Sequence, residues 1–416
     1  MRARTTTLRR LPIAALLAMS AIAAACNDES LMPPAVPTYT GGAMFARYVS
    51  FGNSITAGFQ SFGLSDSLQQ VAYPVLLANA MGTPFAYPKL NNPGCPPPIT
   101  VIFTSPPTRL GGASDTACAF RAAPTPPHLN NVAFPGADVL ELLNTGYGPP
   151  QPPASSTDAY KLFLLGGRTE IQWARDIKPT FVSVWVGNND ALGAILDTGN
   201  AGQAADITPP DSFARRYNAL MDSIDSFGSV KGGILLGVVQ VKGAPYVSQG
   251  RAYYQASLAI PTLTVLPNCL DSVIVAPGDT ERVLIPFHYG APRVAAAAGG
   301  TPTTIDCSDP HVISVSEAIN MLTTIVQYNA TIQAAATARN WAYVDPNPLL
   351  AALAANPGAI RPFPAFPPDP NYMTAPFGTA ISRDGVHPST STQKLVAQSL
   401  QQAINAKYGS AIPAIP

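Results

Sequence analysis

Charged residues are scarce in this chain of 416 residues. Lysine, arginine, aspartate and glutamate make up only 12% of it, about half the usual share, and the formal net charge is zero. This neutrality argues against a nucleic acid as the main partner, so we expect none. The hydrophobic content of 47% excludes a disordered chain and can supply a sizeable core.

Histidine and cysteine are also few, and their spacing excludes several kinds of site. None of the four histidines belongs to an HExxH motif, and no cysteines have the CxxC spacing of a structural zinc site. The GxSxG elbow of many serine hydrolases is absent as well. We therefore expect neither a metal nor another cofactor.

The N-terminus has a basic start, an apolar stretch and a run of small residues. This order, in MRARTTTLRRLPIAALLAMSAIAAAC, is typical of a secretory signal and is too short for a good membrane span. AIAAAC resembles the cleavage motif of bacterial lipoproteins. Residues 1–25 are then a signal peptide, Cys26 is the lipidated first residue and residues 26–43 form a flexible tether. Ordinary cleavage nearby, with Cys26 not lipidated, is the alternative.

An exported protein, anchored by lipid to a bacterial membrane and facing the periplasm or the cell surface, is the expected product. The remaining cysteines are an even number, which suits an oxidising compartment: Cys95, Cys118, Cys269 and Cys307. Three pairings are possible. We favour Cys95 with Cys118 and Cys269 with Cys307, because each pair closes a local loop in a segment rich in proline and glycine.

Helical and strand-like patterns alternate along the rest of the chain. Strands are expected at 44–51, 179–187, 232–241 and 341–346, and the main helices at 72–82, 168–177, 211–228, 312–340 and 390–408. Buried strands alternating with helices predict a three-layer α/β/α sandwich with a mainly parallel sheet, similar to flavodoxin. Residues 44–410 are expected to form one domain with large, irregular loop insertions at about 93–128, 191–211 and 242–310.

Four short blocks lie after expected strands or before the last helix. They place Ser54 in SFGNSITAG, Gly136 in NVAFPG, Asn189 in GNND, and Asp384 with His387 in SRDGVHPS. Because the carboxyl ends of parallel strands meet at one edge of a sheet, these residues should lie close together. A hydroxyl, an imidazole, a carboxylate and hydrogen-bond donors are the parts of a serine acyl-transfer site.

In this order the blocks resemble those of the GDSL family of serine esterases and lipases, also called SGNH hydrolases. The resemblance implies that Ser54 is the nucleophile, that His387 is the base and that Asp384 orients it. It also implies an oxyanion hole made by the N–H groups of Ser54 and Gly136 and the side-chain amide of Asn189. Taken singly, each block fits an ordinary turn or helix cap.

Three details accompany the resemblance. His311 follows Asp309 and Pro310 and suits capping better than catalysis. Thr390 and Gln393 are expected to form a capping box that starts the last helix after His387. Asn53 departs from the family, which usually has Asp before its serine, so one negative charge near the nucleophile is missing.

The substrate class stays open between two kinds of ester. Acyl chains of lipids and acetyl groups on polysaccharides both suit such a site, and the chain is expected to act as a monomer. A rival hypothesis keeps the fold without the chemistry, as a surface lipoprotein that binds glycan or lipid at the same edge of the sheet.

Overall fold

The computed structural model describes residues 42–104, 106–113, 116, 118–119, 121–143, 156–356, 358–365 and 374–416. The predicted signal peptide, most of the tether and the lipidation candidate Cys26 lie outside these residues.

Four parallel strands form the central sheet. They are β1 (Tyr48–Gly52), β4 (Phe181–Trp185), β5 (Gly232–Leu236) and β12 (Ala342–Val344), in the order β1-β4-β5-β12. Every residue of β1, β4 and β5 is buried, as continuous apolar runs predict for strands that are covered on both faces.

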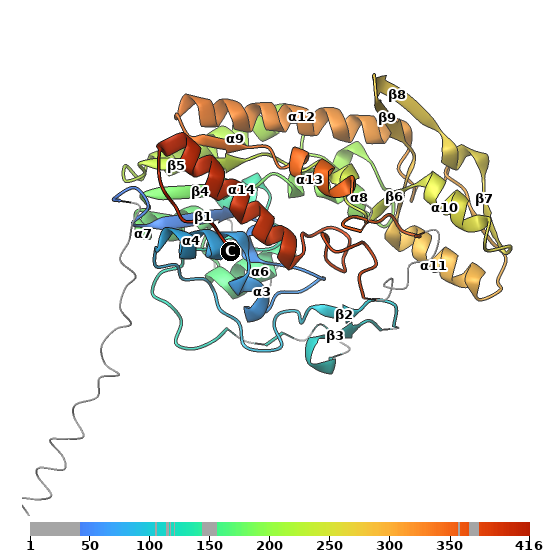
Figure 1. The fold of residues 1–416 in the computed structure, drawn as a ribbon, viewed down its shortest axis with the longest axis horizontal. Coiled ribbons are helices and arrows are strands. Elements are labelled where there is room, and N and C mark those ends of the chain that lie inside the picture. Colours follow the sequence, from blue (N-terminus) through green and yellow to red (C-terminus); the bar gives the residue numbers. More distant parts are fainter. Residues whose placement is uncertain are drawn as a thin grey trace, which may run out of the picture. The chain divides into compact units, whose positions relative to one another are not determined.

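Helices flank this sheet on both faces, and Figure 1 labels most of them. They are α2 (Ser54–Ala57), α3 (Asp66–Gln70), α4 (Tyr73–Met81), α5 (Val139–Leu143), α6 (Ser156–Leu165), α7 (Glu170–Ile177), α8 (Asn189–Leu196), α9 (Pro210–Asp225), α10 (Gly250–Ser257), α11 (Phe287–Ala298), α12 (Val315–Ala338), α13 (Asn347–Ala354) and α14 (Thr390–Tyr408).

Alternate residues of each strand enter two separate cores. On one face Tyr48 and Phe181 pack with residues of α4 and α14. On the other face Val49 and Val182 pack with residues of α5, α7, α9 and α12. The sheet therefore lies between two helical layers, which confirms the α/β/α sandwich expected from the alternation of strands and helices.

Local sequence signals account for several helix ends. Ser314 and Glu317 form a capping box at the start of α12, and Thr169 and Gln172 form one at the start of α7. At the other end of a helix, Gly82 adopts φ 64° and stops α4, as its position after the last apolar residue predicts. These caps explain why the predicted helices lie close to the observed ones.

The segment from residue 242 to 310 is not irregular, so that expectation was wrong. It holds helices α10 and α11 and most of the short strands outside the central sheet: β6 (Val247–Gln249), β7 (Leu263–Val265), β8 (Ser272–Ala276), β9 (Asp279–Arg282), β10 (Leu284–Pro286) and β11 (Thr303–Ile305). Strand β6 pairs with β10 and β7 with β11, partners distant along the chain. The alternation of apolar and polar residues cannot reveal such strands, because each is only three residues long.

Other predictions need smaller corrections. The segment from residue 191 to 211 opens inside helix α8 instead of a loop. No strand leads into Gly136, because Asn131 makes only a single bridge to Ser50 of β1. Among its described residues, the proline-rich region contributes the short strands β2 (Ile99–Val101) and β3 (Thr108–Arg109) and a 3-10 turn at Leu110–Gly112. Packing continues beyond residue 410, since Ile412 and Ile415 are buried in the core beside α14.

Both favoured disulfides are present. Cys95 is bonded to Cys118 and Cys269 to Cys307. The second bond ties the 3-10 turn before β8 to the loop after β11, and so links two segments outside the central sheet. Within the described residues, no helix is long and apolar enough to cross a membrane.

Candidate active site

Ser54 lies at the turn between the end of β1 and the start of α2. Asn53 caps this helix, because its side-chain oxygen accepts the N–H of Ile55 at 3.1 Å. Only glycine fits at position 52. The Cβ of any other residue would lie 2.2 Å from the Thr56 hydroxyl oxygen and 2.6 Å from a backbone oxygen of β4. The turn thus places Ser54, a residue that is 7% exposed, at the carboxyl edge of the sheet.

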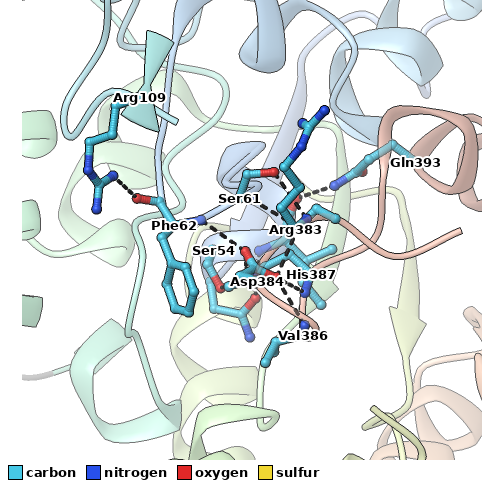
Figure 2. Close-up of polar contacts among 12 residues, drawn as sticks. Ser54, Ser61, Phe62, Arg109, Arg383, Asp384, Val386, His387 and Gln393 are labelled. Carbon is cyan, nitrogen blue, oxygen red and sulfur yellow. Dashed lines mark hydrogen bonds and ion pairs between the residues drawn. The ribbon is translucent and has the colours of Figure 1, made fainter. Parts of the chain in front are cut away.

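A hydrogen-bonded chain joins Ser54 to the loop before α14 (Figure 2). The Ser54 hydroxyl lies 2.8 Å from Nε2 of His387, and Nδ1 of His387 lies 2.9 Å from Oδ2 of Asp384. His387 is 9% exposed, and its ring lies against Phe59 at a centroid distance of 5.0 Å. The hydroxyl, imidazole and carboxylate are therefore arranged so that a proton can pass from oxygen to nitrogen while the imidazolium is stabilised.

Asp384 is buried but well supplied with donors. One carboxylate oxygen accepts the N–H groups of Val386 and His387 and the hydroxyl of Ser382, each at 2.9 Å, and the other accepts the N–H of Phe62 at 3.1 Å. Burial by itself raises the pKa of Asp384, but the His387 imidazole and the backbone N–H groups outweigh it and hold the pKa at about 2. The carboxylate is thus ionised at neutral pH.

The donor Phe62 belongs to a strained turn. Ser61 and Phe62 have φ values of 55° and 53°, and Gln60 and Gly63 exchange two backbone hydrogen bonds across them. Two consecutive positive φ values are typical of a type I′ hairpin, which usually needs Asn and Gly. Arg109 donates to the Phe62 carbonyl at 3.1 Å and so fixes the peptide next to Asp384 (Figure 2).

Gln393 does not cap α14, so the expected capping box was wrong. Ser389 occupies the N-cap without a side-chain cap bond. The Gln393 side chain instead accepts the N–H of Tyr73 at 3.0 Å and donates to the carbonyl of Ile55 at 3.0 Å. It is fully buried and ties the Ser54 turn, α4 and α14 together. The side-chain oxygen and nitrogen of Gln393 are therefore occupied by bonds to Tyr73 and Ile55 and are not available to cap the helix.

Asn189 and Asp190 both contact the turn after Gly136. The Asn189 amide donates to the carbonyl of Ala137 at 2.8 Å, and an oxygen of Asp190 accepts the N–H of Val139 at 3.0 Å. Gly136 has φ 86°, and a Cβ there would lie 2.2 Å from the Thr157 hydroxyl oxygen, so glycine is required. Within the described chain, the N–H groups of Ser54 and Gly136 have no protein acceptor and are available to a ligand.

An apolar pocket opens beside the hydroxyl. Ser54, Asn189 and His387 line it together with these mainly apolar side chains: Ile55, Leu192, Val239, Val241, Leu349, Leu350, Leu353 and Val386. Its volume is about 90 Å³. Three leucines of α13 form one wall. Gly136 does not line this pocket, and Asp384 lies behind His387.

Two buried acids near the site were not expected from the sequence. Glu170 is fully buried and accepts the N–H of Gly52 at 2.9 Å. This bond fixes the backbone two residues before Ser54. Burial raises the pKa of Glu170 well above its usual range, and the Gly52 N–H and the charge of Lys161 offset this only in part. Its signal in the sequence is only a glutamate at the start of an amphipathic helix, which usually reads as a solvated first-turn acid.

The second buried acid is Asp190. Burial, followed by repulsion from Asp138, raises the pKa of Asp190 to about 7, while the N–H of Val139, the hydroxyl of Thr208 and the charge of Arg216 lower it in part.

Among the described residues, no group of three or more His, Cys, Asp or Glu side chains could hold a metal ion.

No family model and no curated protein matches this chain. Solved structures similar to it include the acetylxylan esterase Axe2 of Geobacillus stearothermophilus, at 15% identity and a TM-score of 0.36 over 88% of this chain and 95% of that one. A GDSL-like lipase of Parabacteroides merdae gives 11% and 0.37 over 86% and 94%. The α/β hydrolase LAE5 from a Lake Arreo metagenome gives 12% and 0.36 over 89% and 97%. At these identities and TM-scores the similarities establish nothing about activity.

The raised pKa of Asp190 predicts a pH-dependent stability. Between about pH 4 and pH 7 the unfolded chain releases this proton while the folded chain keeps it, so the contribution of Asp190 to stability is lost as the pH rises. Asp190→Asn cannot ionise. The melting temperature of Asp190→Asn should therefore rise relative to that of the wild type from pH 4 to pH 7.

The control for this experiment is Asp279→Asn, which changes an exposed aspartate of β9. Its melting curves should run parallel to those of the wild type at every pH. If the Asp190→Asn curves also run parallel, the buried carboxyl does not titrate as described.

Proposed function

We propose that this chain is a serine esterase that hydrolyses carboxylic esters through an acyl-enzyme on Ser54. The observation that carries the proposal is the unbroken path from the Ser54 hydroxyl through both nitrogens of His387 to the carboxylate of Asp384, with distances of 2.8 Å and 2.9 Å.

The reaction starts when Nε2 of His387 accepts the proton of Ser54 as the hydroxyl oxygen attacks the ester carbonyl. Asp384 accepts a hydrogen bond from Nδ1–H, which selects the tautomer with a free Nε2, and it stabilises the imidazolium. The same imidazole then protonates the leaving alcohol. Water, deprotonated by His387, hydrolyses the acyl-enzyme and frees the carboxylic acid.

The oxyanion that forms during each attack needs donors at the carboxyl edge of the sheet. We assign this role to the N–H groups of Ser54 and Gly136 and to the side chain of Asn189. Both N–H groups lack a protein acceptor in the described chain, and Asn189 lines the pocket. The contact of Asn189 with Ala137 leaves one amide hydrogen for substrate and fixes the direction of the amide.

The acyl group occupies the apolar pocket under α13 in this proposal. Its volume of about 90 Å³ is small for a ligand pocket, since typical values are about 300 to 1,000 Å³. We therefore propose an ester with a short acyl chain. An acetyl group on a polysaccharide is the second candidate, favoured by the same small volume. A surface lipoprotein that binds without catalysis would not need the proton path.

The protein is proposed to work outside the cytoplasm as a monomer. Two disulfides support an oxidising compartment, and the basic, apolar and small-residue order of the N-terminus supports export. Lipid on Cys26 would anchor the domain to a membrane through the tether of residues 26–43. Mass spectrometry of protein from bacterial membranes would detect that lipid on the N-terminal peptide.

Loss of either end of the proton path should abolish turnover. We expect Ser54→Ala to remove detectable hydrolysis of p-nitrophenyl butyrate, and Asp384→Asn to lower kcat by about 10⁴-fold because the wrong histidine tautomer is then favoured. The matched control is Ser223→Ala, which removes an exposed hydroxyl on α9 and should leave kcat unchanged. Wild-type turnover in both Ser54→Ala and Asp384→Asn would mean that another group is the nucleophile, and no hydrolysis by the wild type would favour the non-catalytic lipoprotein.

Shortening a leucine of α13 should change the preferred chain length. Leu350→Ala removes part of the pocket wall, so the ratio of kcat/KM for octanoate to that for acetate should rise about tenfold. A series of p-nitrophenyl esters from acetate to palmitate measures this ratio. Leu258→Ala, at a leucine that is 69% exposed and away from the pocket, should leave the ratio unchanged. An unchanged ratio in Leu350→Ala would remove α13 from the acyl site.

A further inference from the structure

Two consecutive helices, α6 and α7, contact both backbone segments that carry the N–H donors of the proposed oxyanion hole. Thr157 of α6 packs against Gly136, where its hydroxyl oxygen would lie 2.2 Å from an added Cβ. Glu170, the first residue of α7, accepts the N–H of Gly52 at 2.9 Å. These helices therefore contact the chain at Gly136 and the chain that leads into Ser54.

Lys161 lies one turn after Thr157 on α6 and contacts the chain on both sides of Gly136. Its ammonium group lies 5.5 Å from the centre of the Phe134 ring, two residues before that glycine. It also forms an ion pair with Glu141 of α5, the helix that begins three residues after the glycine. Residues four apart lie on the same face of a helix, so Thr157 and Lys161 hold the same segment of chain.

The charged groups of Lys161 and Glu170 are placed where burial is costly. Lys161 is 3% exposed, and Glu170 has no exposed surface. One carboxyl oxygen of Glu170, Oε1, has no hydrogen-bond partner among the described residues. Burial raises the pKa of Glu170, and the charge of Lys161 offsets this only in part. Unpaired buried polar atoms cost stability, and perturbed acids of this kind are concentrated at functional sites.

The bond from Gly52 to Glu170 acts at the start of the turn that carries Ser54. Gly52 ends β1, and Asn53 caps α2 through the N–H of Ile55. A shift of the Gly52 peptide would turn the Ser54 N–H, because only Asn53 separates the two residues. A misplacement of about 1 Å can cost about 100-fold in rate.

We propose that Glu170 and Lys161 are positioning residues for the oxyanion hole. Glu170 sets the direction of the Ser54 N–H through Gly52, and Lys161 holds the segment that carries the Gly136 N–H. Neither side chain lines the apolar pocket, so both act through the backbone. The inference rests on the proposed function, since it assigns supports to the same two donors.

Variants that keep or lose the reach of Glu170 test its role, with kcat expressed per active site counted by fluorophosphonate titration. Glu170→Asp keeps the acid but is one methylene shorter and cannot reach Gly52. We expect its kcat for p-nitrophenyl butyrate to fall about tenfold or more, while KM changes by less than about twofold. Glu170→Gln keeps an oxygen that can accept the N–H and should retain kcat within about twofold of the wild type. The matched control is Glu281→Asp, at a buried glutamate of β9 that pairs with Lys242, and it should leave kcat unchanged.

Lys161→Met tests the Gly136 side of the oxyanion hole and decides the outcome if Glu170→Asp does not fold. It should also lower kcat per site without raising KM. Inhibition by n-butylboronic acid gives a second readout, because its tetrahedral adduct with a serine mimics the charged intermediate. Its inhibition constant should rise by about the factor by which kcat falls. A residue that only supports the fold would lower the number of active sites and leave kcat per site unchanged.

The outcomes separate this inference from the proposed function. Where the wild type hydrolyses esters and Ser54→Ala does not, unchanged kcat per site in Glu170→Asp and Lys161→Met would overturn the inference alone. Equal losses in Glu170→Gln and Glu170→Asp, or an equal loss in the control, would do the same. A loss at only one of the two positions would overturn the role of the other residue. No hydrolysis by the wild type would contradict the proposed function, and the inference would fail with it.

Discussion

The hydrogen bond between Ser54 and His387 depends on bringing together two segments that are 333 residues apart in the chain. Ser54 follows the first strand of the sheet, and His387 precedes the last helix. Gln393 joins these segments at their base, because it bonds both to Ile55, next to the serine, and to Tyr73 of α4. The central sheet and the packing of α4 against α14 set the distance between hydroxyl and imidazole.

Both carboxylate oxygens of Asp384 are satisfied by hydrogen bonds, and these bonds fix the geometry of the contact. Asp384 accepts four hydrogen bonds besides that from the His387 ring, and one of them requires the strained turn at Ser61 and Phe62. Strain of this kind persists only where the surroundings hold it. Here the holding group is Arg109, whose guanidinium bonds to Phe62 and to Pro97. The disulfide at Cys95 lies two residues from Pro97 and anchors the same loop.

Much of the sandwich could be predicted from the sequence, because long apolar runs and capping residues are local signals. Strands β4 and β5 and helices α9, α12 and α14 lie close to their predicted ranges. The short strands of the 242–310 segment could not be predicted, since they form only through pairing with distant partners. The order of the motifs predicted the site residues Ser54, Gly136, Asn189, Asp384 and His387, of which Ser54, Asn189 and His387 line one pocket.

Supporting residues were missed for a different reason. Gln393, Glu170 and Phe62 have ordinary local readings, as a cap, a solvated acid and a surface aromatic, and only tertiary contacts give them another role. The Ser-Phe turn is the extreme case, because its sequence argues against its conformation. The motifs predict the groups that we propose to react, whereas the groups that hold them in place can be recognised only from burial and hydrogen bonding.

Covalent trapping of the nucleophile tests the central claim most directly. The full chain would be treated with a fluorophosphonate, digested and mapped by mass spectrometry, with His387→Ala as the comparison. We expect one adduct per chain on the peptide that contains Ser54, and almost none in His387→Ala because no base then activates the hydroxyl. An adduct on another residue, or no adduct at all, would contradict it.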